Sequence, residues 1–281
     1  TQTPREISLI DLKGNEYSTL LKADNPLEDY EIGSMEMLEL KAEDGTDLYA
    51  RMIKPSHFDS AKKYPVLVYV YGGPHAQMVK DTWLGAAPLW MYYMAEQGYL
   101  VFTLDNRGSA NRGLAFEQVI HRQLGKVEML DQLKGIEYLK SLDYVDKNRL
   151  GINGWSYGGY MTTSLMLHYP DVFKVGVAGG PVIDWKYYEA MYTERYMDTP
   201  EENPDGYMET SLLNRVDSLE GELMLIHGTS DDVVVWQHSL DFVKKCISGG
   251  KQIDYFVYPG HKHNVYGKDR VHLIEKILNY F

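Results

Sequence analysis

The chain has 281 residues, of which 44% are hydrophobic and 24% charged, a composition that excludes a disordered chain, a collagen and a coiled coil. This is enough apolar material for one large globular domain or two small ones. With 28 basic against 40 acidic residues the formal net charge is −12, which excludes nucleic acid and anionic membranes as expected partners, because phosphate binding needs a cationic surface.

The N-terminal segment predicts a hairpin and a connector. Residues 7–12 and 16–21 are two β-type runs around a Lys-Gly-Asn turn at 13–15, and a polar connector follows at 22–34. A lone hairpin is marginal in water, so we expect it to belong to a larger sheet or to pack on the main body. The chain starts without an initiator methionine, an apolar leader or a run of membrane-spanning length, so we expect it to be cut from a longer protein or processed.

From residue 35 onward, apolar runs of strand length alternate with amphipathic stretches of helical length. Solid apolar runs are typical of parallel strands that are buried on both faces. We therefore predict an α/β fold with a doubly wound, mostly parallel sheet of about eight strands over residues 35–281. The expected strands lie near 36–42, 47–54, 65–71, 100–104, 149–153, 174–178, 222–227 and 252–258, and the expected helices near 83–97, 127–141, 159–168, 235–247 and 267–280.

A strand, a tight turn and a helix surround Ser156 in the run RLGINGWSYGGY at 149–160. The turn from Gly154 to Gly158 has the G-x-S-x-G pattern, which lifts a nucleophilic serine clear of a sheet. Glycines are needed there because a Cβ would clash with the neighbouring strand and helix. The alternative is a serine that only caps the helix, but the context favours a nucleophile.

A serine nucleophile needs a base and an orienting carboxylate, which on this pattern follow in the order Ser, Asp or Glu, His. The loops after two later strands carry the runs HGTSDD and PGHKH. The first loop offers Asp231 and Asp232, one of which would face the base while the other caps a helix. The second offers His261 and His263; as an H-x-H metal pair they lack an acidic or cysteine cluster to complete a site, so no metal is expected.

Six motifs follow one another along the chain: VYGGPHAQ at 70–77, DNRGS at 105–109, GWSYGGY at 154–160, WKYYEAMYTERYM at 185–197, HGTSDD at 227–232 and YPGHKH at 258–263. Together they resemble the catalytic domain of the prolyl oligopeptidase superfamily (peptidase family S9), in particular its dipeptidyl peptidase IV-like branch and the bacterial prolyl tripeptidyl peptidases. The resemblance implies an α/β-hydrolase domain at 35–281, preceded in the parent chain by a β-propeller of which residues 1–34 would be the last piece and connector. It also suggests a homodimer and an exported or periplasmic location.

Carried over position by position, the resemblance implies that Ser156 is the nucleophile, Asp231 the orienting carboxylate and His263 the general base. Asp232 would then be the neighbour of Asp231 on the side of the helix that follows. The hydroxyl of Tyr71 and the backbone N–H of Tyr157 would hold the oxyanion. The alternative for Tyr71 is a tyrosine that fills space at the end of a strand.

The resemblance also implies a flat aromatic pocket for proline, a compact ring that aromatic faces recognise by shape. Part of it would lie on a helix expected over 185–197, where two tyrosines four residues apart share one face; core packing is the alternative reading of that face. The expected lining is Val182, Trp185, Tyr188, Tyr192 and Val234, together with Tyr157.

Two positions bear on whether the released peptide is a dipeptide or a tripeptide. Dipeptidyl peptidase IV has an asparagine two residues after the catalytic aspartate, and this chain has Val233. At Glu189 the chain resembles the bacterial prolyl tripeptidyl peptidases. We expect Glu189 to bind the ammonium of the substrate, together with glutamates of the propeller; the alternative is a surface ion pair with Arg195.

The expected reaction is acyl transfer by a serine exopeptidase that releases N-terminal tri- or dipeptides from proline-containing oligopeptides by cleavage after proline, without a metal or organic cofactor. Activity should fall at acid pH as His263 becomes protonated. Two alternatives remain. One is an esterase or acylaminoacyl peptidase, because the triad does not choose between amide and ester. The other is a non-catalytic interaction module, against which the intact triad argues.

Overall fold

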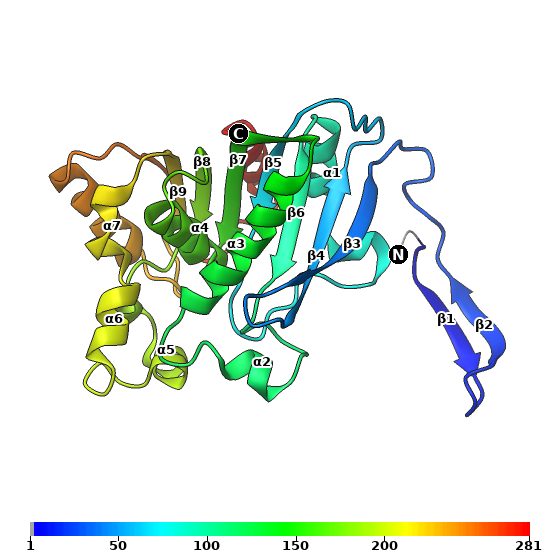
Figure 1. Cartoon of the computed structure of the whole chain (residues 1–281), viewed down its shortest axis with the longest axis horizontal. Coiled ribbons are helices and arrows are strands. Elements are labelled where there is room, and N and C mark those ends of the chain that lie inside the picture. The colour runs from blue at the N-terminus through cyan, green and yellow to red at the C-terminus, as the bar shows by residue number, and fades with distance from the viewer. Residues whose placement is uncertain (1–2) are drawn as a thin grey trace.

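The computed structural model describes residues 3–281, with most of the chain folded around one sheet (Figure 1). Eight strands form that sheet in the order β10-β9-β8-β7-β5-β6-β4-β3. The predicted fold class, a mixed α/β fold with a mostly parallel sheet of about eight strands, is confirmed. The strands are β3 (Ser34–Lys41), β4 (Asp47–Lys54), β5 (Tyr64–Tyr69), β6 (Leu100–Asp105), β7 (Val145–Trp155), β8 (Val175–Gly179), β9 (Glu222–Gly228) and β10 (Asp254–Tyr258).

The pairing of the strands determines where the loops that carry the predicted catalytic residues meet. Strand β4 runs antiparallel to β3 and β6, whereas β5, β6, β7, β8, β9 and β10 pair in parallel. The carboxyl ends of the parallel strands therefore lie along one edge of the sheet, where ligands of open α/β sheets bind. The loops after β5, β7, β9 and β10 all begin at this edge.

Helices cover both faces of the sheet (Figure 1). The larger core lies between the sheet and α3, α4 and α7, where Ile136, Leu165 and Phe242 are buried. On the other face, α1 packs through Met91 and α8 through Leu273. The helices are α1 (Leu89–Glu96), α2 (Leu114–Gln118), α3 (Lys126–Ser141), α4 (Tyr157–His168), α5 (Ala190–Met197), α6 (Pro204–Thr210), α7 (Gln237–Ser248) and α8 (Lys268–Leu278), with four short 3-10 turns at Trp83–Ala86, Trp185–Tyr187, Leu212–Asn214 and Val216–Ser218.

The helix expected over 83–97 is shorter than predicted. The 3-10 turn at Trp83–Ala86 contains residues with left-handed backbone angles, and α1 begins only after Pro88. The short helices α2 and α6 were not expected from the sequence, because five to seven residues carry too little periodicity to be recognised. No helix within residues 3–281 is both long and apolar enough to cross a lipid bilayer.

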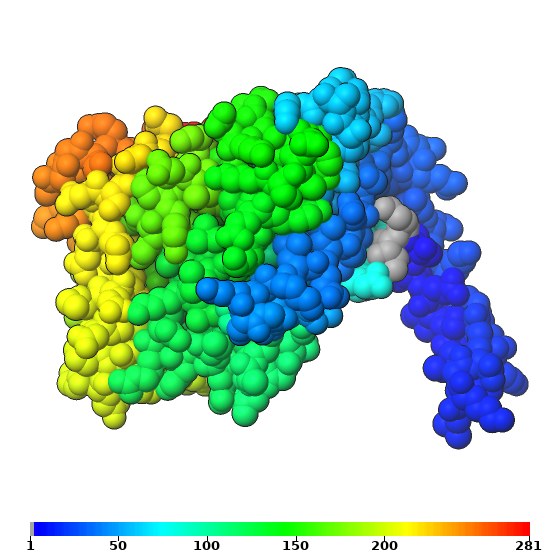
Figure 2. Space-filling view, viewed as in Figure 1, coloured from blue at the N-terminus to red at the C-terminus, as the bar shows by residue number. Residues whose placement is uncertain are grey.

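The predicted N-terminal hairpin forms and stands away from the main body (Figures 1 and 2). Strand β1 (Glu6–Ile10) pairs antiparallel with β2 (Glu16–Lys22), and Gly14 in the turn has a φ of 83°. Every residue of β2 is exposed. The expectation that the hairpin packs on the main body is therefore wrong, whereas its membership of a larger sheet stays a prediction.

Candidate active site

Ser156 lies between the end of β7 and the start of α4 in a backbone conformation that is rare for a residue with a side chain. Its φ is 62° and its ψ is −118°. Two hydrogen bonds hold this turn: the Ser156 N–H donates to the Gly179 carbonyl at 2.8 Å, and the Tyr160 N–H donates to the Ser156 carbonyl at 3.0 Å. Such a conformation costs on the order of 1–3 kcal/mol, so the surrounding packing has to impose it.

The glycines around Ser156 allow the strand, the turn and the helix to approach one another. A Cβ on Gly154 would overlap the carbonyl of Gly158 and the carbonyl oxygen of Val70. A Cβ on Gly158 would overlap the same Val70 oxygen, and one on Gly159 would lie 2.7 Å from the Gly179 oxygen. Because each obstacle is backbone, it has little freedom to move. The steric reason given for the G-x-S-x-G pattern is confirmed.

The loops after β9 and β10 bring one aspartate and one histidine together. His263 Nδ1 lies 2.8 Å from Asp231 Oδ2, and Asp231 Oδ1 accepts the N–H groups of Val233 and Val234 at 2.9 Å each. The neighbouring Asp232 points to solvent and pairs with Lys262 at 2.5 Å. The expectation that the second aspartate caps a helix is wrong, because α7 begins only at Gln237.

The second histidine of the PGHKH run does not enter this arrangement. His261 Nε2 lies 2.8 Å from Asp269 Oδ2, so its partner is a carboxylate of α8. Within residues 3–281 no three His, Cys, Asp or Glu side chains gather as a metal site would require. The structure therefore separates the two histidines that the sequence offered as alternatives.

A buried histidine beneath Asp231 was not singled out by sequence reasoning. His227 Nε2 lies 2.8 Å from the Val234 carbonyl and 3.2 Å from Asp231 Oδ2, while its Nδ1 lies 2.7 Å from Ser239 Oγ. Nε2 faces two oxygens that can only accept, those of the Val234 carbonyl and the Asp231 carboxylate, so Nε2 carries a proton and donates it to them. The only signal in the sequence is that His227, the last residue but one of β9, is the first residue of the HGTSDD run.

The hydrogen bonds around Asp231 keep it ionised. Burial by itself raises the pKa of Asp231, but the hydrogen bonds from His227 and His263 outweigh burial and hold that pKa well below its usual range. An ionised Asp231 accepts the Nδ1–H of His263, which fixes the ring and leaves Nε2 free to accept a proton.

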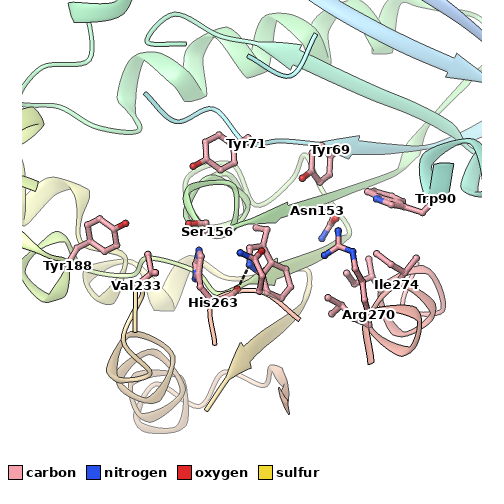
Figure 3. A pocket seen from close by; sticks show the side chains of 14 residues that line it. Tyr69, Tyr71, Trp90, Asn153, Ser156, Tyr188, Val233, His263, Arg270 and Ile274 are labelled. Atoms are coloured by element: carbon pink, nitrogen blue, oxygen red, sulfur yellow. Dashed lines mark hydrogen bonds between the residues drawn. The ribbon is translucent and has the colours of Figure 1, made fainter. Parts of the chain in front are cut away.

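Ser156 and His263 line one cavity of about 460 Å³ at the edge of the sheet. Figure 3 shows their side chains in the middle of this cavity, with Tyr71 facing them from the loop after β5. Burial raises the pKa of Tyr71 above its usual value, so its hydroxyl stays protonated and able to donate. Tyr157 is the first residue of α4, where the backbone N–H has no partner within the helix. Two donors are thus available beside the serine.

The residues expected to bind proline form an aromatic cluster next to the serine. Trp185 is buried, and its ring centroid lies 5.5 Å from that of Tyr157, 5.8 Å from that of Tyr188 and 6.3 Å from that of Tyr192. Tyr188 also lines the cavity that contains Ser156. Val182 and Val234, the two expected aliphatic members of the lining, are buried.

The helix expected over 185–197 is interrupted. A 3-10 turn ends at Tyr187, Tyr188 and Glu189 are extended with ψ values of 160° and 135°, and α5 begins at Ala190. Tyr188 and Tyr192 still meet edge to face, with ring centroids 5.1 Å apart. Their contact therefore comes from the bend in the chain and not from a shared helix face.

Glu189 and Arg195 do not form the ion pair considered above. Glu189 is exposed, and the described part of the chain holds no ion pair between the two side chains. Arg195 instead lines a separate depression with His75 and Tyr196. The role of Glu189 in binding an ammonium group stays a prediction.

A buried carboxyl group supports the aromatic cluster from within the core and was also missed. Glu128 Oε1, on the first turn of α3, accepts the Tyr157 hydroxyl at 2.6 Å and the Gly125 N–H at 2.9 Å. Burial raises the pKa of Glu128 to about 7. Sequence alone shows only a glutamate near a helix start, a pattern that is common where helices are merely capped.

Comparisons with known proteins agree with this arrangement. The model of the prolyl oligopeptidase family matches residues 88–281. Dipeptidyl peptidase 8 of Homo sapiens is 36% identical over 253 residues, 89% of this chain and 28% of that protein. Dipeptidyl peptidase 4 of Sus scrofa is 39% identical over 225 residues, 79% of this chain and 29% of that protein.

Two solved structures superimpose closely on this chain. A putative dipeptidyl aminopeptidase IV from Bacteroides ovatus is 58% identical with a TM-score of 0.97, and Porphyromonas gingivalis dipeptidyl peptidase 4 is 35% identical with a TM-score of 0.92. Each comparison covers 99% of this chain and 40% of the other. The chain therefore spans less than half of the solved relatives and under a third of the two curated ones.

Proposed function

The chain belongs to the prolyl oligopeptidase family, in the neighbourhood of the dipeptidyl peptidase IV-like serine peptidases, and on that premise we propose that it carries the catalytic site of a serine exopeptidase that cleaves after proline. One observation carries the proposal. Ser156 sits in a strained turn on the rim of the cavity that His263 also lines, and His263 is hydrogen-bonded to an ionised Asp231.

The proposed reaction starts with proton transfer. His263 Nε2 takes the proton of Ser156 while Oγ attacks the substrate carbonyl, and the negative charge moves to the carbonyl oxygen. The Tyr71 hydroxyl and the Tyr157 N–H donate to this oxygen. His263 then gives its proton to the nitrogen of the leaving peptide, the C–N bond breaks, and a water molecule attacks the resulting ester in the same way.

The aromatic cluster supports the choice of proline. Tyr188 lines the cavity beside Ser156, with the buried Trp185 packed behind its ring and Tyr157 next to Trp185, and an aromatic surface of this kind is one that a pyrrolidine ring contacts without needing a hydrogen bond. The relatives' names favour release of dipeptides, and the resemblance of Glu189 to the tripeptidyl enzymes keeps tripeptides as the alternative. We assign to the exposed Glu189 the binding of the substrate ammonium.

We also propose that residues 1–34 belong to a separate β-domain of the parent protein and that 35–281 are the catalytic domain. The support is the hairpin, whose apolar side chains Leu12, Tyr17 and Leu20 are exposed away from the main body. Apolar strands of this kind are stable when further strands cover them.

The test compares three chromogenic substrates: a Xaa-Pro anilide, a Xaa-Xaa-Pro anilide and a short acyl ester. The proposal expects turnover of a proline anilide that Ser156→Ala abolishes, and a Glu189→Gln variant with a raised KM for substrates that have a free ammonium group. Turnover of esters with inert proline anilides would establish an esterase instead. Failure of Ser156 to react with a fluorophosphonate would favour a non-catalytic module.

A further inference from the structure

The cavity at Ser156 extends well beyond the groups that the proposed chemistry uses. On one side of the serine lie Tyr188 and Val233; on the other, Figure 3 shows Asn153, Tyr69 and Arg270. Asn153 is three residues before Ser156 on β7, which places this far end roughly 10 Å along the strand from the serine. The nucleophile thus divides the cavity into two arms.

The far arm carries a positive charge, that of the solvent-exposed residue Arg270, which pairs with no other described side chain. Arg270 lies in the first turn of α8, and its guanidinium points into the cavity toward Asn153 (Figure 3). In residues 3–281 its side chain makes no hydrogen bond and no ion pair, although Asp269 beside it is engaged by His261. By contrast, Arg107 pairs with Asp131 at 2.7 Å.

Arg270 acts on the cavity wall electrostatically. Burial raises the pKa of the Tyr69 hydroxyl, and the nearby charge of Arg270 opposes that rise. An unpaired guanidinium that faces a partly enclosed site attracts an anion, and its planar donors fit a carboxylate.

The remaining walls of this arm are apolar. They consist of Trp90 from α1 and of Leu273, Ile274 and Ile277 from α8. Few polar groups on an apolar lining are typical of sites that bind a small ligand in one orientation. The ligand that matches this arm carries an apolar side chain next to a carboxylate.

We propose that this arm is a subsite for the leaving segment: it takes an apolar residue that follows the scissile bond, and Arg270 pairs with the terminal carboxylate of a leaving dipeptide. The assignment rests on the proposed function, because placing proline beside Tyr188 directs the leaving segment to the opposite side of Ser156. Two extended residues span about 7 Å, and a hydrogen bond from the guanidinium to the terminal carboxylate adds about 3 Å, which together match the roughly 10 Å to the far end of the arm. The enzyme would then favour short peptides with a free C-terminus.

The experiment measures kcat/KM for Gly-Pro-Leu-Leu, for the same peptide with a C-terminal amide, and for Gly-Pro-p-nitroanilide, which has no carboxylate. The wild-type protein is expected to prefer the acid to the amide about tenfold, the size of one charge-assisted hydrogen bond. Arg270→Gln should bring this ratio close to one. Lys268→Gln, which removes a cation from the same turn of α8 outside the cavity, should keep the ratio.

The anilide distinguishes a failure of the proposed subsite from a failure of the proposed function. If it is cleaved and Arg270→Gln keeps the acid-to-amide preference, or the wild-type protein has none, the subsite is refuted while the proposed function stands. If none of the three substrates is cleaved and a Xaa-Xaa-Pro anilide is inert as well, the proposed function fails and the subsite with it. Loss of the preference in both Arg270→Gln and Lys268→Gln would show a diffuse charge effect and also overturn the assignment.

Discussion

The carboxyl group of Glu128 allows a stability prediction that can be worked from the structure. Its side chain is buried, and Oε1 accepts hydrogen bonds from Tyr157 and Gly125, whereas Oε2 has no hydrogen-bond partner among the described residues. Burial raises its pKa from the ordinary 4.5 to about 7. The folded chain therefore holds a proton between these two pH values that the unfolded chain has released.

The sign and size of the effect follow from proton linkage. The native state binds more protons than the unfolded state from about pH 4.5 to pH 7, so the free energy of unfolding falls as the pH rises across this window. The contribution is complete below pH 4.5 and is lost above pH 7. A displacement of this size corresponds to about 3 kcal/mol, a large fraction of the 5–15 kcal/mol typical of a whole domain.

Glu128→Gln removes the ionisation and keeps an oxygen that can accept the Tyr157 hydroxyl. The variant should therefore gain stability relative to the wild-type chain as the pH rises from 5 to 8, by about 3 kcal/mol across the range. A constant cost of burying the amide would lower the free energy of unfolding of the variant equally at every pH, without changing how it depends on pH.

Urea unfolding at four pH values measures this difference. Glu137→Gln is the control, because it removes an exposed carboxylate from the same helix, where Glu137 pairs only with Lys134. The difference in free energy of unfolding between Glu137→Gln and the wild-type chain should change by less than about 1 kcal/mol over the same pH range. If the free energies of unfolding of the wild-type chain and of Glu128→Gln depend on pH in the same way, the reasoning is refuted.

Three further predictions concern the turn and the groups around the serine. Asp231→Asn should lower kcat about 10⁴-fold, because the amide favours the wrong tautomer of His263; a loss below tenfold would contradict this. Tyr71→Phe should lower kcat about 10²- to 10³-fold at nearly constant KM, since the hydroxyl acts only where charge develops in the transition state; a change in KM alone would speak against an oxyanion donor. Gly154→Ala should destabilise the chain by about 1–3 kcal/mol or more, because its Cβ meets backbone atoms of Gly158 and Val70, whereas the Cβ of Gly176→Ala meets only side chains, those of Met166 and, at 3.4 Å, Thr162; equal melting temperatures would show that the turn can relax.

Much of the fold could be predicted because its signals are local. The eight strands appear in the sequence as apolar runs, and the elbow at Ser156 appears as glycines at fixed offsets from a serine. The break at Tyr188 was missed, because the aromatic residues that follow it suit a helix equally well. The hairpin was predicted in outline, and of the two settings expected for it the structure excludes packing on the main body.

The sequence by itself determined the kinds and order of the elements and the loops from which a triad could come, since backbone preferences and apolar periodicity act over a few residues. Between Asp231 and Asp232 and between His261 and His263 the sequence chose only through a family resemblance; the contacts that distinguish these residues join loops about thirty residues apart and appear only in the tertiary structure. The same holds for the partners of Glu128 and for the direction of Arg270. A buried or unpaired charge is a property of what the fold places around it, which no single stretch of sequence contains.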